Sequence, residues 1–151
     1  MPQSLARVLI HTVFSTKHRQ PFLQDSDLRS ELYAFMGGIA DELGCGPIRI
    51  GGTADHVHLL TTLSRTVTIA DFVKEVKRVS TDWVQRRGAA LEEFHWQAGY
   101  GVFSVSESNK DAVMHYILNQ EEHHQSLTFQ EEFRRFCDKH GIDYDERYVW
   151  D

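Results

Sequence analysis

The chain has few cysteines and no long hydrophobic run, and both absences narrow the class of protein. Only Cys45 and Cys137 occur among its 151 residues, which argues against a disulfide framework and indicates a reducing compartment. No stretch approaches the roughly 18 apolar residues that a membrane span needs. The apolar residues 8–10 are too few for a secretion signal and are followed by His11. We therefore expect a cytoplasmic protein that does not enter a membrane.

Internal repeats, low-complexity tracts and linkers are also missing. A chain of this length fits one domain with a core of its own, so we expect residues 1–151 to form a single domain.

An excess of positive charge is missing too, because the net charge is −6, which by itself argues against a nucleic-acid partner. However, residues 65–87 contain six basic and three acidic residues, whereas residues 121–151 contain nine acidic and four basic ones. An acidic C-terminal region can hide a basic surface, so composition leaves the partner open.

Hydrophobic periodicity predicts the order of the elements. Residues 5–15, 48–52 and 56–63 are typical of strands, and residues 94–106 contain two strand-like segments separated by glycines. Apolar spacings of three and four predict helices at residues 28–43, 68–85, 109–124 and 128–140. The order β-α-β-β-α-β predicts an α+β, ferredoxin-like fold, with an antiparallel sheet, helices on one face and additional C-terminal helices.

Two histidines separated by one residue, His56 and His58, are the first candidates for chemistry. Alternate residues of a strand point to the same face, so both imidazoles project together and each can give one nitrogen to a metal ion. The motif is short, and a solvated strand face can carry the same residues. The pattern alone therefore leaves both interpretations open.

A tyrosine and a glutamine one helical turn apart are the second candidates. Tyr116 and Gln120 share one face of the helix predicted at 109–124, and the Gln120 carbonyl oxygen is a possible third metal ligand. Tyr116 is a poor nucleophile while protonated, and a nearby metal or base would activate it. His123, on about the same face, is either a proton acceptor or a surface residue. A half-buried tyrosine without a catalytic role fits the same pattern.

Basic residues are the third candidates. Lys74, Lys77 and Arg78 lie at i, i+3 and i+4 of a predicted helix and could follow a phosphate backbone. Lys17 and Arg19, directly after the first strand, could do the same. A solvated face explains these residues equally well, so their role depends on where the fold places them.

Together these features resemble a known family, the small single-tyrosine HUH transposases of bacterial insertion sequences, which mobilise single-stranded DNA. The REP-associated tyrosine transposases are close relatives of that family. The similarity runs over nearly the whole chain, from residues 11–17 (HTVFSTK) to residues 144–150 (YDERYVW). Its most telling segments are residues 51–60 (GGTADHVHLL), 96–106 (WQAGYGVFSVS) and 116–124 (YILNQEEHH).

The resemblance implies a role for each candidate residue. His56 and His58 match the histidine–hydrophobic–histidine motif, Tyr116 matches the catalytic tyrosine, and Gln120 matches the position that completes the metal site. The implied cofactor is Mg²⁺ or Mn²⁺. The implied partners are single-stranded DNA, with hairpins at the ends of the element, and a second copy of the chain. In such a homodimer the tyrosine helix of one protomer can complete the histidine site of the other.

The implied reaction is cleavage and rejoining of single-stranded DNA through a 5′-phosphotyrosine intermediate. One alternative is a non-catalytic or domesticated protein of the same fold that binds hairpins and regulates. Others are a related nuclease that initiates rolling-circle replication or plasmid transfer, and a metal-dependent hydrolase that does not act on DNA. A covalent protein–DNA adduct would separate the transposase from the non-catalytic protein and the hydrolase.

Overall fold

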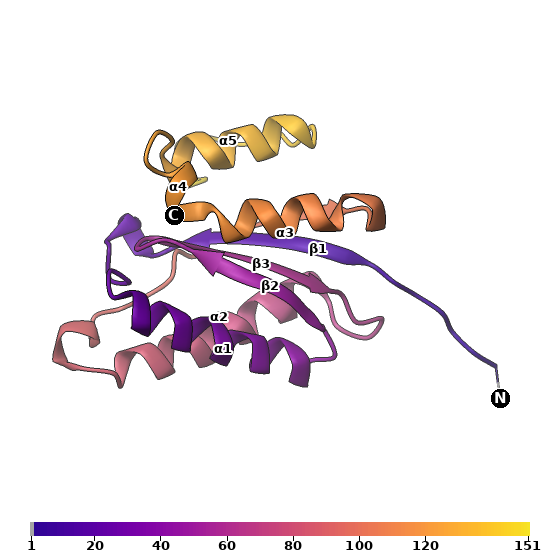
Figure 1. Cartoon of the computed structure of the whole chain (residues 1–151), viewed down its shortest axis with the longest axis horizontal. Helices are drawn as coiled ribbons and strands as arrows, with labels where there is room; N and C mark the ends of the chain where they lie inside the picture. Colours follow the sequence, from indigo (N-terminus) through magenta and orange to yellow (C-terminus); the bar gives the residue numbers. More distant parts are fainter. Residues whose placement is uncertain (1) are drawn as a thin grey trace.

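A computed structural model describes residues 2–151 and shows a three-layer arrangement around one antiparallel sheet (Figure 1). Helices α1 and α2 cover one face of the sheet, and α3, α4 and α5 lie on the other. The four strands are β1 (Leu9–Ser15), β2 (Pro47–Gly52), β3 (His56–Thr62) and β4 (Gly101–Val105). The helices are α1 (Ser26–Glu42), α2 (Ile69–Gln85), α3 (Lys110–Leu118), α4 (Gln120–His123) and α5 (Phe129–Lys139), with short 3-10 turns η1 (Lys17–Arg19), η2 (Ala89–Leu91) and η3 (Glu107–Asn109).

The strand order is β2-β3-β1-β4, and every neighbouring pair is antiparallel. This confirms the predicted α+β, ferredoxin-like plan with additional C-terminal helices. The helix starts follow the capping chemistry of the sequence, since Asp25, Thr68 and Thr128 each accept a backbone hydrogen bond at the start of α1, α2 and α5. None of the helices in residues 2–151 is long and apolar enough to cross a membrane.

Two hydrophobic clusters lie on the two faces of the sheet. Val57 and Leu59 of β3 belong to the larger cluster, together with residues of α1 and α2. The smaller cluster joins Val13 and Phe103 of the sheet to Phe129, Phe133 and Cys137 of α5. Because strand residues alternate between faces, the residues of β3 on either side of Val57 point toward the C-terminal helices.

Three predicted elements differ from the structure. The first strand begins at Leu9 rather than at residue 5. Residues 94–106 contain one strand, β4, instead of two strand-like segments, and an isolated bridge between Thr16 and Trp96 precedes it. The helix predicted at 109–124 is divided at Asn119, whose ψ of 23° interrupts the helix and separates α3 from α4.

A glycine lets α3 approach the sheet closely. A Cβ atom on Gly51 would lie 2.9 Å from both the Ile117 carbonyl oxygen and its Cγ2 atom, which no side chain tolerates without a shift of the backbone. Gly51 pairs with His58 in the register of β2 and β3. The close approach therefore places the residues around Ile117 directly over the histidine pair.

Candidate active site

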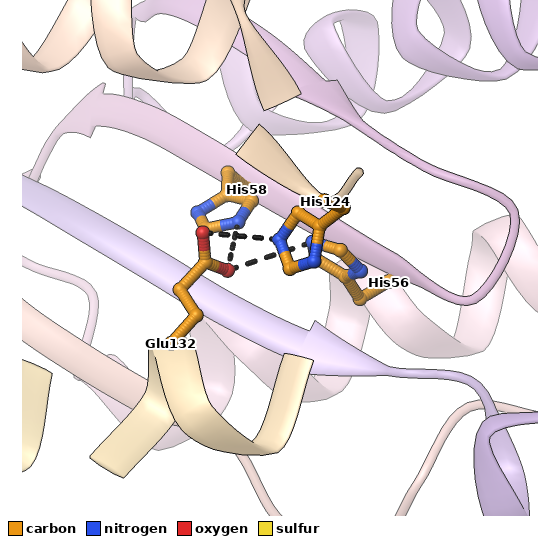
Figure 2. Close-up of side chains that lie close together, drawn as sticks. All are labelled: His56, His58, His124 and Glu132. Carbon is orange, nitrogen blue, oxygen red and sulfur yellow. Dashed lines mark hydrogen bonds and ion pairs between the residues drawn. The ribbon is translucent and has the colours of Figure 1, made fainter. Parts of the chain in front are cut away.

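His56 and His58 lie on the same face of β3, as strand alternation predicts. Both side chains are completely buried and point toward the C-terminal helices, where they meet His124 and Glu132 (Figure 2). A solvated strand face, the alternative interpretation of the motif, is therefore excluded. Their ring centroids lie 5.1 Å apart.

The outer nitrogen of each imidazole is held by a neighbouring polar group. His56 Nδ1 lies 2.8 Å from Asp55 Oδ1 and 2.9 Å from Thr53 Oγ1. His58 Nδ1 lies 2.7 Å from Nε2 of His11, which is itself buried in β1. Burial, together with the nearby His58, lowers the pKa of His11 well below its usual value, so His11 is neutral and can accept a hydrogen bond from His58. These contacts fix both rings with their Nε2 atoms toward the centre of the cluster.

The inner nitrogens face oxygen atoms that also carry lone pairs. His56 Nε2 lies 2.9 Å from Gln120 Oε1, and His58 Nε2 lies 2.9 Å from Glu132 Oε1. If the Nδ1 atoms carry the ring protons, each of these contacts brings two electron-pair donors together. Such contacts need a proton or a cation between them. The donor set therefore fits a divalent metal ion.

Two residues that sequence reasoning did not assign to the site also belong to it. One ligand atom from each of His56, His58, His124 and Glu132 lies within 4.8 Å of the others, which is a group that could hold a metal ion. His124 Nε2 is 3.1 Å from Glu132 Oε2. That is an ion-pair distance, although the angle is not that of a hydrogen bond.

Opposite pKa shifts follow from this ion pair. Burial alone would raise the pKa of Glu132, but His124 and His58 outweigh burial and hold the pKa well below its usual value. Burial alone would lower the pKa of His124, but the Glu132 carboxylate raises it above its usual value. Glu132 is therefore ionised at neutral pH, with only 1% of its surface exposed.

Tyr116 reaches the same cluster from α3. Its hydroxyl donates a hydrogen bond to Glu132 Oε2, and Gln120 Nε2 donates to the same oxygen over 3.1 Å. The Tyr116 ring stacks on His123 at a centroid distance of 4.7 Å. Burial and the Glu132 charge raise the pKa of Tyr116, so the phenol is protonated in this arrangement. Residues of one chain therefore suffice to bring Tyr116, Gln120 and the histidine pair together.

A sequence signal for Glu132 exists in the pattern of α5. The buried residues of this helix are Phe129, Glu132, Phe133 and Cys137. A carboxylate on the apolar stripe of an amphipathic helix needs a partner in the interior, so its position marks it as a site residue. Sequence reasoning singled out His123 as a proton acceptor or a surface residue and gave His124 no role. The structure separates their roles, with His123 against the Tyr116 ring and His124 beside Glu132.

The predicted basic helix does not face this site. Its residues Lys74, Lys77 and Arg78 lie on α2, across the sheet from the histidine pair. The Lys77 ammonium donates to the carbonyl oxygens of residues 97, 98 and 99 at 2.7, 3.2 and 2.6 Å, so its donors are used within the fold. Arg78 pairs with Glu75 at 2.8 Å. Periodicity identified an exposed flank but could not tell which sheet face the helix covers.

Hollows reach the cluster from two sides. One of about 830 Å³ is lined in part by His124, Asp55 and the predicted DNA contact Arg19. The turn that contains Arg19 also contains Lys17, and both side chains are exposed. Another hollow, of about 310 Å³, is lined in part by Tyr116 and Glu132. A third, of about 740 Å³, lies along α1 and β2 and includes none of the cluster residues, so it is not part of this site.

Comparison with known proteins gives the class to which this fold and site belong. Residues 4–120 match the model of the IS200-like transposases, and the chain belongs to this family of DNA-cleaving enzymes. The match includes the histidine pair and Tyr116 and ends at Gln120, so His124 and Glu132 lie beyond it.

Individual relatives agree with this assignment. The ISDra2 transposase TnpA of Deinococcus radiodurans is 27% identical over 115 residues, which cover 73% of this chain and 81% of that protein. A crystal structure from Deinococcus radiodurans, assigned as a transposase, has a TM-score of 0.62 at 26% identity and covers 80% of this chain and 95% of its own. The structure of a REP-associated tyrosine transposase bound to a REP hairpin has a TM-score of 0.59 at 12% identity, covering 82% and 73%. That last similarity concerns the fold alone.

Proposed function

We propose that this chain cleaves and rejoins single-stranded DNA with Tyr116 as the nucleophile. The observation that carries the proposal is the position of the Tyr116 hydroxyl, which donates to the same Glu132 carboxylate that lies 2.9 Å from His58 Nε2. Nucleophile and candidate metal ligands thus share one buried centre. Membership of the IS200-like transposase family supports the same conclusion.

In the proposed reaction the Tyr116 oxygen attacks a backbone phosphorus, and the bond from that phosphorus to the 3′-oxygen breaks. The products are a 5′-phosphotyrosine and a 3′-hydroxyl, whose oxygen takes a proton from water. The phenol proton leaves toward Glu132, the acceptor to which it is already bonded. Because the phosphotyrosine keeps the energy of the broken bond, a 3′-hydroxyl can reverse the step and join DNA without ATP.

The residues that would hold a divalent ion are His56 and His58, with Gln120, Glu132 or His124 completing the set. When bound, Mg²⁺ or Mn²⁺ would supply Lewis-acid polarisation of the scissile phosphate. Two imidazoles suit Mn²⁺ better than Mg²⁺, which prefers oxygen ligands. The contribution of the chain is to fix both rings through Asp55, Thr53 and His11.

We propose hairpin-bearing single-stranded DNA as the partner, and a homodimer as the working assembly, in which two copies supply two tyrosines. Support for the hairpin is the related fold that was solved with a REP hairpin bound. Light scattering of the full-length protein with and without a hairpin oligonucleotide tests the assembly. A mass of one chain under both conditions would remove the dimer from the proposal.

The cleavage assay uses end-labelled oligonucleotides with hairpins, with either Mg²⁺ or Mn²⁺. We expect single-stranded flanks to be cut and fully double-stranded controls to remain intact. A hairpin-binding regulator would retard the same oligonucleotides on a gel without cutting them. Cleavage that persists in the Tyr116→Phe variant would refute the nucleophile assignment.

A further inference from the structure

One face of the C-terminal helix α5 is turned toward the catalytic tyrosine. Glu132, Arg135, Phe136 and Lys139 follow one another at i, i+3, i+4 and i+7, so they share this face. All four line the hollow of about 310 Å³ beside Tyr116, which His123 and Leu127 complete. A phosphate that reacts with the Tyr116 oxygen must come within bonding distance of it, and Tyr116 is one of the residues that line this hollow.

The charges on this face distinguish it from the rest of the acidic C-terminal region. Four basic residues occur after residue 120. Arg134 pairs with Glu146 at 2.6 Å, and Arg147 pairs with Asp145 at 2.8 Å. Arg135 and Lys139 are exposed, and neither forms an ion pair or a side-chain hydrogen bond within residues 2–151. The two cations left without a partner are therefore the two that border the hollow at Tyr116.

We infer that this face of α5 binds the phosphate backbone of the single strand next to the bond that Tyr116 cleaves. Arg135 and Lys139 each contact a backbone phosphate, and Leu127 and Phe136 give an apolar wall against which a base can pack. The Glu132 carboxylate does not prevent phosphate binding on this face, because its two oxygens face His58, His124 and Tyr116. The inference rests on the proposed DNA-cleaving function and adds the part of the chain beyond the family match.

The test measures binding separately from chemistry. Fluorescence anisotropy of a labelled single-stranded oligonucleotide is recorded without metal, in a Tyr116→Phe background, at several salt concentrations. The double variant Arg135→Ala, Lys139→Ala is expected to bind about tenfold more weakly, because two exposed charge contacts are lost. Its salt slope should fall by about 1.4, since each phosphate contact contributes about 0.7 for single strands.

A matched control removes the same charge elsewhere. Arg65 and Arg86 are exposed and lie in the loop after β3 and at the end of α2, away from the hollow. The variant Arg65→Ala, Arg86→Ala should bind DNA with nearly the wild-type affinity and salt slope. Equal losses in both variants, or unchanged binding in the α5 variant, would overturn the inference, and circular dichroism confirms that each variant is folded.

The proposed function and this inference can fail separately. Adduct formation by the wild-type protein with Mn²⁺ supports the proposed function even if the α5 variant binds DNA normally, in which case only the role of α5 is wrong. If the wild type forms no adduct while the α5 variant still loses affinity and salt slope, the DNA surface stands and cleavage by Tyr116 does not.

Discussion

The hydrogen bond between Tyr116 and Glu132 joins the proposed nucleophile to the candidate metal-ligand cluster, and its free energy can be measured. The perturbation is a double-mutant cycle of Tyr116→Phe, Glu132→Gln and the combination of both. Tyr116→Phe removes only the hydroxyl, and Glu132→Gln removes the charge while keeping the shape. The cycle isolates the coupling between the two groups from their separate contributions to the free energy of unfolding.

The structure gives the expected magnitude. Glu132 is only 1% exposed, and the Tyr116 hydroxyl donates directly to its ionised oxygen. Hydrogen bonds to charged groups contribute roughly 1.5–3 kcal/mol, and burial limits solvent screening of this one. We therefore expect a coupling of about 1.5–3 kcal/mol, which is several times the error of additivity for independent sites.

The assay is urea unfolding followed by tryptophan fluorescence at one fixed protein concentration. Tyr148→Phe is the matched control, because the Tyr148 side chain is 64% exposed and does not contact Glu132. The control cycle with Glu132→Gln should be additive. A coupling between Tyr116 and Glu132 below about 0.5 kcal/mol would refute the shared buried centre. A coupling between Tyr148 and Glu132 as large as the one between Tyr116 and Glu132 would refute it too.

Three further predictions follow from the same cluster. Calorimetry should show Mn²⁺ binding that is lost in the His56→Ala, His58→Ala double variant; unchanged binding would place the ion elsewhere. Mixing Tyr116→Phe with the double histidine variant should not restore cleavage, because one chain brings these groups together, and any cleavage by the mixture would show a site completed between protomers. The pKa of Glu132 is lowered in the folded protein, so the stability that it contributes is present above the unfolded pKa of about 4.3. This stability should be lost as the pH falls below that value, more steeply in the wild type than in Glu132→Gln, and parallel pH profiles from urea unfolding would contradict the ionised state.

Local patterns were sufficient for the order of elements and for the histidine pair. Alternation in β3 depends only on the backbone of the strand, so it predicted correctly that His56 and His58 share a face. Spacings of three and four located all the longer helices. The break at Asn119 was missed because neither glycine nor proline marks it.

The rest of the site depends on contacts between residues far apart in the chain. Glu132 meets a histidine 74 positions earlier, and His11 meets the same histidine, His58, from 47 positions before it. No local periodicity contains such distances. The position of the basic helix α2 was also beyond local patterns. Amphipathicity identified its exposed flank but did not specify the face of the sheet that the helix covers.

The most direct test of a tyrosine nucleophile is to locate the covalent bond. The wild-type protein is incubated with a hairpin-bearing single strand and Mn²⁺, denatured, digested with protease and nuclease, and analysed by mass spectrometry. We expect a nucleotide attached to Tyr116 and no adduct in the Tyr116→Phe variant. A nucleotide on any other residue, or an adduct of equal yield in that variant, would contradict it.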